Sequence, residues 1–448
     1  MKKSMRFTLI FIGILCFNAC QPDGSNEPKR LKTAEIDAKV ANSWFSLSLK
    51  LAKETPGFTA PVAARAFAYT GLALYESVVG GMPDYHTLQS HVTNFLPATV
   101  PEPKNSTDYH WGVCANRAMA LMLTNLYKNT SAENLAQIKT LEDQFEAEFA
   151  ATTSQEIFDR SKEYGDMVGA GVYKYSKTDG QDEAYNRNYP ATYNVPSFAG
   201  SWIPTPPTFQ TIPLQPNWGN VRCFVEENGA GVAVAAHPPY STSASSIFYV
   251  QALEIYSFKE TITNDQKNIA AYWYDEPGKS ATPAGHAISI LKQLLEVNKS
   301  NLATAAEAYS KLGIGLHDAF VNSWKSKYKY NLIRPISYIR AQVDPSYQTT
   351  LSTPAYPEYT AINAVQMAAT AEILSSFFGS NTTFTDRTHV SRTDINGTER
   401  VYESFYAAAE EAAFSSMYAG HNFRSAIENG KKQGALVGKN VLAMQFHK

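Results

Sequence analysis

Apolar side chains recur at helical spacing along most of the chain. In the first such stretch they stand three or four positions apart, at Ile36, Val40, Trp44, Leu47 and Leu51. That spacing places them on one face of an amphipathic helix. Comparable stretches predict further helices over 61–79, 111–127, 133–149, 155–175, 246–273, 286–296, 302–324, 361–378, 400–418 and 427–444. Alternation of apolar and polar residues is scarce, and only 221–236 fits one or two short strands. The pattern therefore predicts an all-α fold.

One segment, 185–223, interrupts this helical pattern. Among Tyr, Trp and Phe it carries Pro190, Pro196, Pro204, Pro206, Pro207, Pro213 and Pro216. Proline ends helices, so the segment must be a long extended excursion. Long ordered excursions often form lids or cleft walls, and we place this one over the functional site. A surface wrap that closes the helical core is an equal alternative.

The last predicted helix carries glycine at every fourth position, at Gly430, Gly434 and Gly438. Such a row leaves a smooth face against which another helix can pack closely. Its spacing does not match a phosphate-binding glycine loop. We interpret the row as a packing device.

The first residues are typical of an export signal. Basic residues precede an apolar run over 7–17, which is too short to span a bilayer. Ala19-Cys20 follows, where a bacterial lipoprotein is cleaved and lipidated, although Phe17 replaces the usual leucine. We expect a lipoprotein signal peptide over 1–19, a flexible tether over 20–32 and a single α-helical domain over 33–448. The protein would then be lipid-anchored through Cys20 in the bacterial cell envelope, facing the periplasm or the surface.

Composition narrows the choice of partners. Apolar residues make up 44% of the chain and charged residues 18%, which indicates a globular core. The net charge of −2 gives no attraction to nucleic acid, so no nucleic-acid partner is expected. The 26 tyrosines exceed what a core requires, and tyrosines can line a cleft that holds sugars or lipids. Cys114 and Cys223 remain after processing and could pair in an oxidising compartment.

Lys327 and Arg334 are the most informative residues for chemistry. On a helix, residues seven apart differ by about 20° in direction, so both cations would point the same way. A lysine point charge and an arginine fork together suit a tetrahedral oxyanion. Pro335 disfavours helical geometry at Arg334, which places the arginine where the helix ends. With Lys325 and Lys329 beside them, the same residues also fit an ordinary solvated face.

The surrounding sequence strengthens the oxyanion interpretation. His317-Asp318-Ala319-Phe320, Trp324, Lys327-Tyr328 and Arg334-Pro335 resemble the first motif of the vanadium-dependent haloperoxidases, which share a fold and site with the type 2 phosphatidic acid phosphatases. Similar segments occur at 61–66, 201–207, 216–219 and 283–286, so the resemblance covers nearly the whole mature chain. It implies a multi-helix bundle whose core spans about 246–448, with the earlier helices packed around it. It also implies an oxyanion site that holds vanadate or turns over phosphate.

The second motif of that family departs from the pattern in this chain. The family has Pro-Ser-Gly-His after a Pro-Glu-Tyr lead. Here Pro357-Glu358-Tyr359 runs into Thr360-Ala361-Ile362-Asn363. Serine is thus replaced by Ala361, glycine by Ile362 and the acid-base histidine by Asn363.

The third motif departs in the same way. The family has Ser-Arg, five residues, the histidine that bonds vanadium or attacks phosphorus, and an aspartate four residues later. The register fixed by Phe423-Arg424-Ser425 puts Ser416 at the arginine, Asn422 at the essential histidine and Ala426 at the aspartate. Asparagine keeps hydrogen-bonding groups but is effectively neither basic nor nucleophilic.

Few neighbouring residues could replace the lost histidines. His421 is the candidate substitute for Asn422, although one helical step would turn it about 100° away. Glu358 fits a general acid or a favourable charge at a helix start. Adjacent His317 and Asp318 would not face each other as a dyad.

The remaining histidines suggest no metal. We expect His286 to be structural. The others show no metal-ligand spacing, namely His86, His91, His110, His237 and His389.

Two functional hypotheses remain. In the first, the chain is a catalytically degenerate lipoprotein of the family, a pseudoenzyme that keeps Lys327 and Arg334 and binds a small anionic or sugar ligand without turnover. In the second, it is an active vanadium-dependent haloperoxidase or phosphomonoesterase with vanadate or phosphate at that site. We favour the first, because function depends on the site and both histidines are replaced.

Overall fold

The helices begin where the sequence supplies capping groups. In the computed structural model, which describes residues 30–104 and 107–448, side-chain oxygens of Ser or Thr accept the first free amides of several helices. These caps are Ser131, Ser154, Ser246, Thr263 and Ser404. Other helices carry proline in their first turn, where no amide hydrogen is needed. The predicted signal peptide over 1–19 and Cys20 lie outside the described residues.

The resulting elements are mostly α-helices. The N-terminal ones are α1 (Lys39–Glu54), α2 (Ala60–Val78), α3 (Trp111–Leu126), α4 (Ala132–Ala150) and α5 (Gln155–Ser176). After the excursion come α6 (Glu226–Gly229), α7 (Ile247–Thr261), α8 (Asn264–Tyr272), α9 (Thr282–Val297), α10 (Leu302–Tyr330), α11 (Pro335–Gln342) and α12 (Ile362–Phe378). A small hairpin of β1 (Phe384–Asp386) and β2 (Arg400–Tyr402) precedes α13 (Phe405–Tyr418) and α14 (Arg424–Leu442). The predicted all-α class is confirmed.

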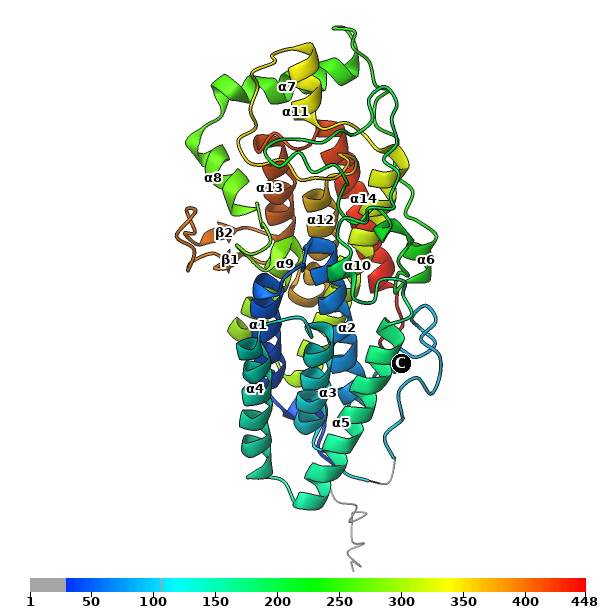
Figure 1. Ribbon diagram of the computed structural model, residues 1–448. Coiled ribbons are helices and arrows are strands. Elements are labelled where there is room, and N and C mark those ends of the chain that lie inside the picture. The colour runs from blue at the N-terminus through cyan, green and yellow to red at the C-terminus, as the bar shows by residue number, and fades with distance from the viewer. Residues whose placement is uncertain (1–29, 105–106) are drawn as a thin grey trace, which may run out of the picture. The chain divides into compact units, whose positions relative to one another are not determined.

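Helices α2 and α10 lie side by side at the centre of the unit formed by residues 31–448 (Figure 1). Small residues let the two backbones approach. A Cβ added at Gly71 would lie 2.7 Å from the Tyr309 carbonyl oxygen, and one at Gly313 would lie 2.9 Å from Cα of Ala68. Almost all of α2 is buried, and α10 is buried from Leu302 to Lys327 apart from Thr304 and Lys325. The N-terminal helices and the C-terminal bundle therefore share one hydrophobic core.

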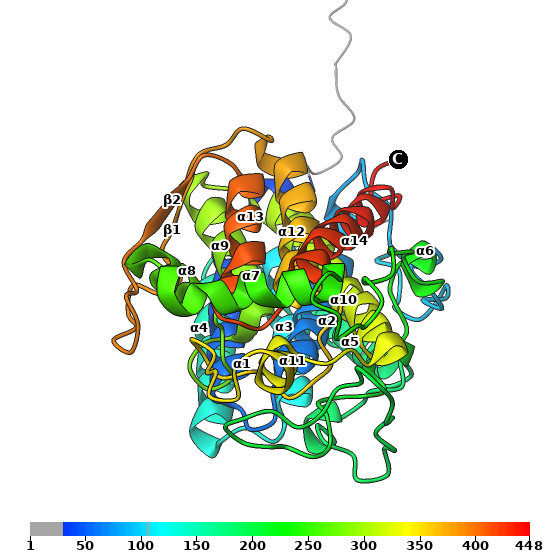
Figure 2. The same ribbon diagram turned by 90° about the horizontal axis from the view of Figure 1, so that it is seen from above.

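Of the C-terminal helices, α12 and α14 pack on α10, and α13 packs on α12, as the view from above shows (Figure 2). The glycine row of α14 lies against α12. A Cβ at Gly430 would lie 3.0 Å from the carbonyl oxygen of Ala361, one at Gly438 would lie 2.9 Å from that of Ala369, and one at Gly434 would overlap that of Val365. The interpretation of this row as a packing device is confirmed.

The prediction of strands in 221–236 is wrong. In place of a strand partner, the backbone amides of Phe224 and Val225 donate to the buried carboxylate of Asp318 at 2.8 and 3.1 Å. Burial raises the pKa of Asp318 to about 7, and the hydrogen bonds that it accepts act against this rise. The side chain of His317 instead bonds the Arg222 carbonyl, so the two adjacent residues form no dyad, as expected.

Other differences concern where helices end. The predicted helix over 246–273 divides in two, because Thr263 and Gln266 form a capping box that starts α8. The strand pair joins Phe384 to Tyr402 in antiparallel register. The apolar pattern left β1 unassigned, and β2 takes the start of the helix predicted over 400–418, which begins only at Phe405. Cys114 and Cys223 are free, buried thiols and do not pair.

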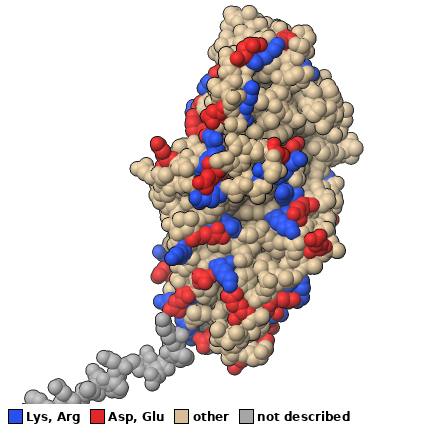
Figure 3. Space-filling model, turned by 90° about the vertical axis from the view of Figure 1, so that its left-hand side faces the viewer, with Lys and Arg blue, Asp and Glu red and all other residues tan. Residues whose placement is uncertain are grey.

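Charges are spread over the surface. Basic and acidic side chains are interspersed over the face seen in Figure 3. Within the described residues, no helix combines the length and apolarity that a membrane crossing requires.

The contact between α12 and α14 generates a test. Replacing Gly434 by alanine should lower the free energy of unfolding by about 2–3 kcal/mol, because the new methyl group overlaps a backbone carbonyl that cannot move alone. Gly229→Ala is the matched control, since the nearest atom to its added Cβ is Cys223 Cβ at 3.8 Å, and it should change stability by less than about 0.5 kcal/mol. Urea unfolding of both variants measures the difference, and equal stabilities would contradict this packing.

Candidate functional site

A cavity of about 310 Å³ collects most residues that the sequence singled out. Its wall combines parts of the chain that are far apart in sequence. They include Tyr189, Pro207, Thr208 and Leu214 of the excursion, Trp273–Pro277, Arg334, Ser352–Tyr356, Ile362, Asn363, Ser416, His421 and Asn422. The prediction that the excursion forms a wall of the site is confirmed.

Lys327 and Arg334 converge without sharing a helix. Helix α10 ends at Tyr330, because Asn331 takes a left-handed conformation with φ of 45°, and Arg334 is the N-cap of α11. The prediction of two cations on one helix is therefore wrong, although the expected helix end before Arg334 is confirmed. The two head groups instead meet one ring: Lys327 Nζ lies 5.0 Å and Arg334 Cζ 4.7 Å from the centroid of Tyr356. A turn of the chain and an aromatic ring bring them together.

Both cations are buried and mostly bonded to the backbone. Lys327 is fully buried and donates from Nζ to the carbonyl oxygens of Glu358 and Thr360. Arg334 donates from Nε to the Tyr356 carbonyl at 2.7 Å and from Nη1 to the His421 carbonyl at 3.0 Å. Its Nη2 is buried and has no hydrogen-bond partner among the described residues. One donor group of the pair is thus left for a ligand.

A buried carboxylate, Glu358, accompanies these cations. Its Oε1 accepts hydrogen bonds from Asn422 Nδ2 at 2.9 Å and from the Phe423 amide at 2.8 Å. Asn422 Nδ2 also donates to the Glu358 carbonyl at 2.9 Å. Phe423 is the N-cap of α14, so Glu358 interacts with the start of that helix and not with the helix that follows it in sequence. The sequence analysis placed Glu358 at the start of the helix that follows it, and the structure instead places it at the start of α14.

Burial and charge act in opposite directions on this group. Burial raises the pKa of Glu358, while the hydrogen bond from Asn422 and the charges of Arg334 and Lys327 act against the rise. Burial and the nearby charge of Arg334 lower the pKa of Lys327 well below its usual value, and Glu358 partly opposes this. Arginine keeps its proton in proteins, so Arg334 remains a cation that Glu358 can offset.

At the other positions where this chain differs from the family motifs, the side chains make structural contacts. Asn363 Nδ2 donates weakly to the Trp273 carbonyl at 3.3 Å and to Ser415 Oγ at 3.5 Å. Ser416 donates to the Ala413 carbonyl of its own helix at 2.9 Å. Ile362 lines the cavity with 7% of its surface exposed, so its side chain occupies part of the space.

The two altered motifs also touch directly. The Ala361 amide donates to the Ala426 carbonyl at 3.1 Å, and both residues are fully buried. A hydroxyl and a carboxylate are replaced by methyl groups at this contact, so the second and third motifs are joined by apolar packing and one backbone hydrogen bond.

His421 lies in the same cavity, but its ring bonds elsewhere. Nε2 lies 3.1 Å from the Leu351 carbonyl oxygen, to which it can only donate. Burial and the charge of Arg334 lower the pKa of His421 to about 3, so the ring is neutral at physiological pH. It is the His421 carbonyl, not its ring, that contacts Arg334.

Vanadate does not fit this set of donors. The resemblance implies a histidine nitrogen bonded to vanadium and three cations around the oxygens. Here the amide nitrogen of Asn422 has no lone pair to offer and is held by Glu358. Two of the three donors of the Lys327 ammonium are taken by backbone carbonyls, and the acidic Glu358 would repel an oxyanion.

A second buried cluster was missed by the sequence analysis. It contains His286 of α9, Asp275 of the α8–α9 link, and Asp386 and His389 of the hairpin. His286 Nδ1 lies 2.8 Å from Asp275 Oδ2, and its Nε2 lies 2.7 Å from Asp386 Oδ2. Burial disfavours the charged ring, yet the two carboxylates outweigh this and raise the pKa of His286 to about 10. The sequence analysis looked for metal ligands only by their spacing along the chain. These residues come from distant segments, so their spacing gave no sign that they meet.

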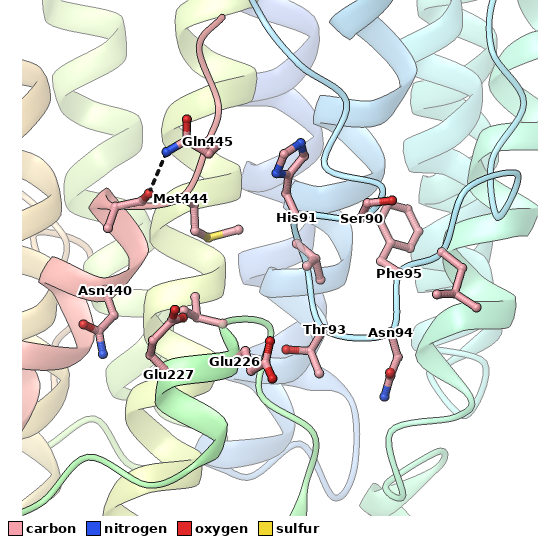
Figure 4. A pocket seen from close by; sticks show the side chains of 14 residues that line it. Ser90, His91, Thr93, Asn94, Phe95, Glu226, Glu227, Asn440, Met444 and Gln445 are labelled. Carbon is pink, nitrogen blue, oxygen red and sulfur yellow. Dashed lines mark hydrogen bonds between the residues drawn. The ribbon is translucent and has the colours of Figure 1, made fainter.

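A larger cavity of about 610 Å³ lies elsewhere (Figure 4). It is formed by the 90–96 loop, Glu226 and Glu227 of α6, and the end of α14 around Asn440. Its charged residues are exposed, and none of the candidate site residues lines it. The smaller cavity is therefore the candidate functional site.

The buried neutral state of His421 predicts how stability depends on pH. Below pH 6.5 the unfolded chain protonates this histidine while the folded chain does not until about pH 3, so stability is lost as pH falls. Compared with His421→Asn, the free energy of unfolding of the wild type should fall by about 1.4 kcal/mol for each pH unit in this range. Urea unfolding at pH 7.5, 6 and 5 measures the slope. His91 is exposed, so His91→Asn is the control. If stability falls with pH equally in His421→Asn and in the wild type, His421 is not the buried neutral group that causes the loss.

Comparisons with known proteins agree with this architecture. A family profile described as the VCPO second helical-bundle domain matches residues 307–447. A crystal structure described as the first bacterial vanadium-dependent iodoperoxidase is 30% identical, with a TM-score of 0.82, and the match covers 92% of this chain and 97% of that one.

Two more distant structures share the fold. Holo-type and apo-type structures of a bacterial vanadium-dependent chloroperoxidase each have a TM-score of 0.64 and 12% identity, covering 87% and 92% of this chain and 92% and 98% of theirs. No curated protein sequence matches significantly. The coverage and identity of the iodoperoxidase match, together with the shared bundle, show that this chain belongs to the vanadium-dependent haloperoxidase superfamily.

Proposed function

We propose that this chain is a catalytically degenerate member of its superfamily, which keeps part of an oxyanion site and binds a small anionic or sugar ligand without turnover. The observation that carries the proposal is the bonding of Asn422. Its amide donates both hydrogen bonds to Glu358, at 2.9 Å each, in the place where the family has its reactive histidine. A group that serves a structural hydrogen bond, and that lacks a basic nitrogen, can neither bind vanadium nor attack phosphorus.

The surrounding groups support this proposal. Asn363 replaces the histidine that would move protons, and an amide cannot do so near neutral pH. His421, the candidate substitute, is neutral and bonded to a backbone carbonyl. The relatives are described as vanadium-dependent, so vanadate is the cofactor that the family suggests, but the side chains here do not fit it.

Glu358 has a specific role in this proposal: its carboxylate is an internal counter-charge for Arg334 and Lys327. It is fully buried beside both cations; burial raises the pKa of Glu358, and the charges of Arg334 and Lys327 act against this rise and favour the ionised form. A built-in anion removes the need for a bound oxyanion to stabilise the buried cations. The same anion weakens the binding of an external oxyanion.

The remaining space suits a small ligand. Arg334 Nη2 is left without a partner, and the walls include the aromatic rings of Tyr189, Trp273, Tyr274 and Tyr356. Aromatic rings pack against sugar rings and apolar groups, and a free arginine nitrogen recognises an anionic or hydroxyl oxygen.

The direct test of degeneracy is turnover. The domain incubated with orthovanadate, hydrogen peroxide and bromide, or separately with p-nitrophenyl phosphate, should show rates equal to the protein-free background. Turnover that is abolished by Lys327→Ala or Arg334→Ala would overturn the proposal and establish the alternative, an active haloperoxidase or phosphomonoesterase.

The internal counter-charge generates a separate prediction. Glu358→Gln keeps the shape and the acceptor for Asn422 but removes the negative charge, so phosphate should bind at least about tenfold more tightly, equivalent to about 1.4 kcal/mol. Isothermal titration with inorganic phosphate measures this. Glu276→Gln is the matched control, because Glu276 lines the same cavity but is exposed, and it should change the affinity little. Equal phosphate affinities for wild type and Glu358→Gln would show that Glu358 carries no counter-charge.

We also propose that the protein is a lipoprotein anchored through Cys20, on the strength of the apolar run over 7–17 and Ala19-Cys20. In a bacterial host, the wild type should partition with membranes and incorporate labelled fatty acid. Cys20→Ala should do neither, while Cys114→Ala, which changes a buried thiol of the domain, should keep both properties. Membrane association of Cys20→Ala would refute this anchor.

A further inference from the structure

The cluster of Asp275, His286, Asp386 and His389 lies behind one wall of the candidate cavity. Its side chains are buried, and Asp275 also lines that cavity. The ligand-type atoms of Asp275, His286 and His389 all lie within 4.8 Å of one another. Three separate segments of the chain therefore bring imidazole and carboxylate groups together in one small, buried volume.

Two atoms in this volume have no hydrogen-bond partner. His389 Nε2 and Asp275 Oδ1 are buried and lie 3.2 Å apart, but their geometry is not that of a hydrogen bond. The His389 ring is fixed by contacts with Tyr272 and His286, at centroid distances of 4.9 and 4.7 Å. The two atoms therefore face each other at ion-pair distance without a hydrogen bond between them. The arrangement has the form of a site that lacks its central partner.

We propose that this cluster binds one divalent transition-metal ion of the zinc type. His286 Nδ1, His389 Nε2 and the Asp275 carboxylate are the ligands. Two imidazoles and one carboxylate are a ligand set that zinc and related ions use in proteins.

Asp386 completes this site without being a ligand. It lies 2.7 Å from His286 Nε2, on the opposite side of the ring from Asp275, and accepts a further hydrogen bond from the Tyr272 hydroxyl at 2.9 Å. Metal-binding histidines commonly donate their second nitrogen to a carboxylate in this way, which fixes the ring and makes it a better ligand.

The balance of charge favours an ion. Without one, both nitrogens of His286 face carboxylate oxygens, which accept only, so the ring carries two protons and one positive charge. Together with the carboxylates of Asp275 and Asp386, this ring gives a net charge of −1 for the three side chains. A divalent ion that replaces the Nδ1 proton, which is released to solvent, brings the total to zero. A neutral buried cluster avoids the cost of an uncompensated charge.

The ion would connect the hairpin to the helical bundle. Asp386 ends β1 and His389 follows it, whereas His286 belongs to α9. Trp273 stacks on His286 with a centroid distance of 4.5 Å, and its carbonyl accepts from Asn363. A bound ion would therefore stabilise the wall of the candidate cavity that Trp273 and Asp275 form.

The test uses the full domain without a histidine tag, freed of metal with a chelator and then titrated with Zn²⁺. One ion should bind per chain, and Co²⁺ should give visible absorption bands typical of nitrogen and oxygen ligands. His389→Ala and Asp275→Asn should each weaken Zn²⁺ binding by more than about 100-fold, and Asp386→Asn by about 10–100-fold. His91→Ala, which removes an exposed histidine outside the cluster, should leave Zn²⁺ binding unchanged.

X-ray absorption of the zinc-loaded wild type gives a readout that does not depend on whether the variants fold. It should show two imidazole ligands on the bound ion. The absence of saturable Zn²⁺ binding by the folded wild type would overturn the proposal, as would binding that His389→Ala leaves intact.

Discussion

Buried charge is the constraint on which the candidate site depends. Lys327 and Arg334 lie in the interior, where a charge without compensation is costly. The chain compensates them with four backbone carbonyls, the ring of Tyr356 and the carboxylate of Glu358. Each of these partners comes from the segment before α12 or from the link before α14. The charges on α10 and α11 thus hold the two altered motifs in place.

Under the proposed function, this compensation explains how the scaffold persists without turnover. In a site that relies on a bound oxyanion, the cations are balanced only when the ligand is present. Here the protein supplies its own anion, and Asn422 fixes it at 2.9 Å. The fold is then independent of a cofactor at this position, and the superfamily architecture, shared with the iodoperoxidase structure at a TM-score of 0.82, remains intact.

Buried charge is also the constraint on the cluster of Asp275, His286, Asp386 and His389, but there it is not fully met by hydrogen bonds. His286 satisfies Asp275 and Asp386, but His389 Nε2 and Asp275 Oδ1 are left without hydrogen bonds. Groups of the protein compensate the charges of Lys327 and Arg334. The cluster around His286 still has two atoms that can bind one more partner. Trp273 stacks on His286, accepts a hydrogen bond from Asn363 and lines the candidate cavity, as Asp275 also does.

The sequence alone determined most of the secondary structure and the family. Apolar spacing located the major helices, because burial of one face requires a period near 3.6 residues. The glycine row predicted a close helix contact, which α12 and α14 form. The motif around Lys327 and Arg334 indicated the superfamily, and the second and third motifs predicted which of its reactive residues are replaced.

Tertiary structure alone decided how the remaining groups are used. Sequence spacing could not show that α10 ends before Arg334, that Glu358 bonds Asn422 and the start of α14, or that His421 turns to Leu351. It also gave no sign that His286 and His389 would meet, because they are brought together by the packing of a hairpin on α9. Local periodicity follows from neighbours along the chain, whereas the partner of a buried polar group is chosen by the whole fold.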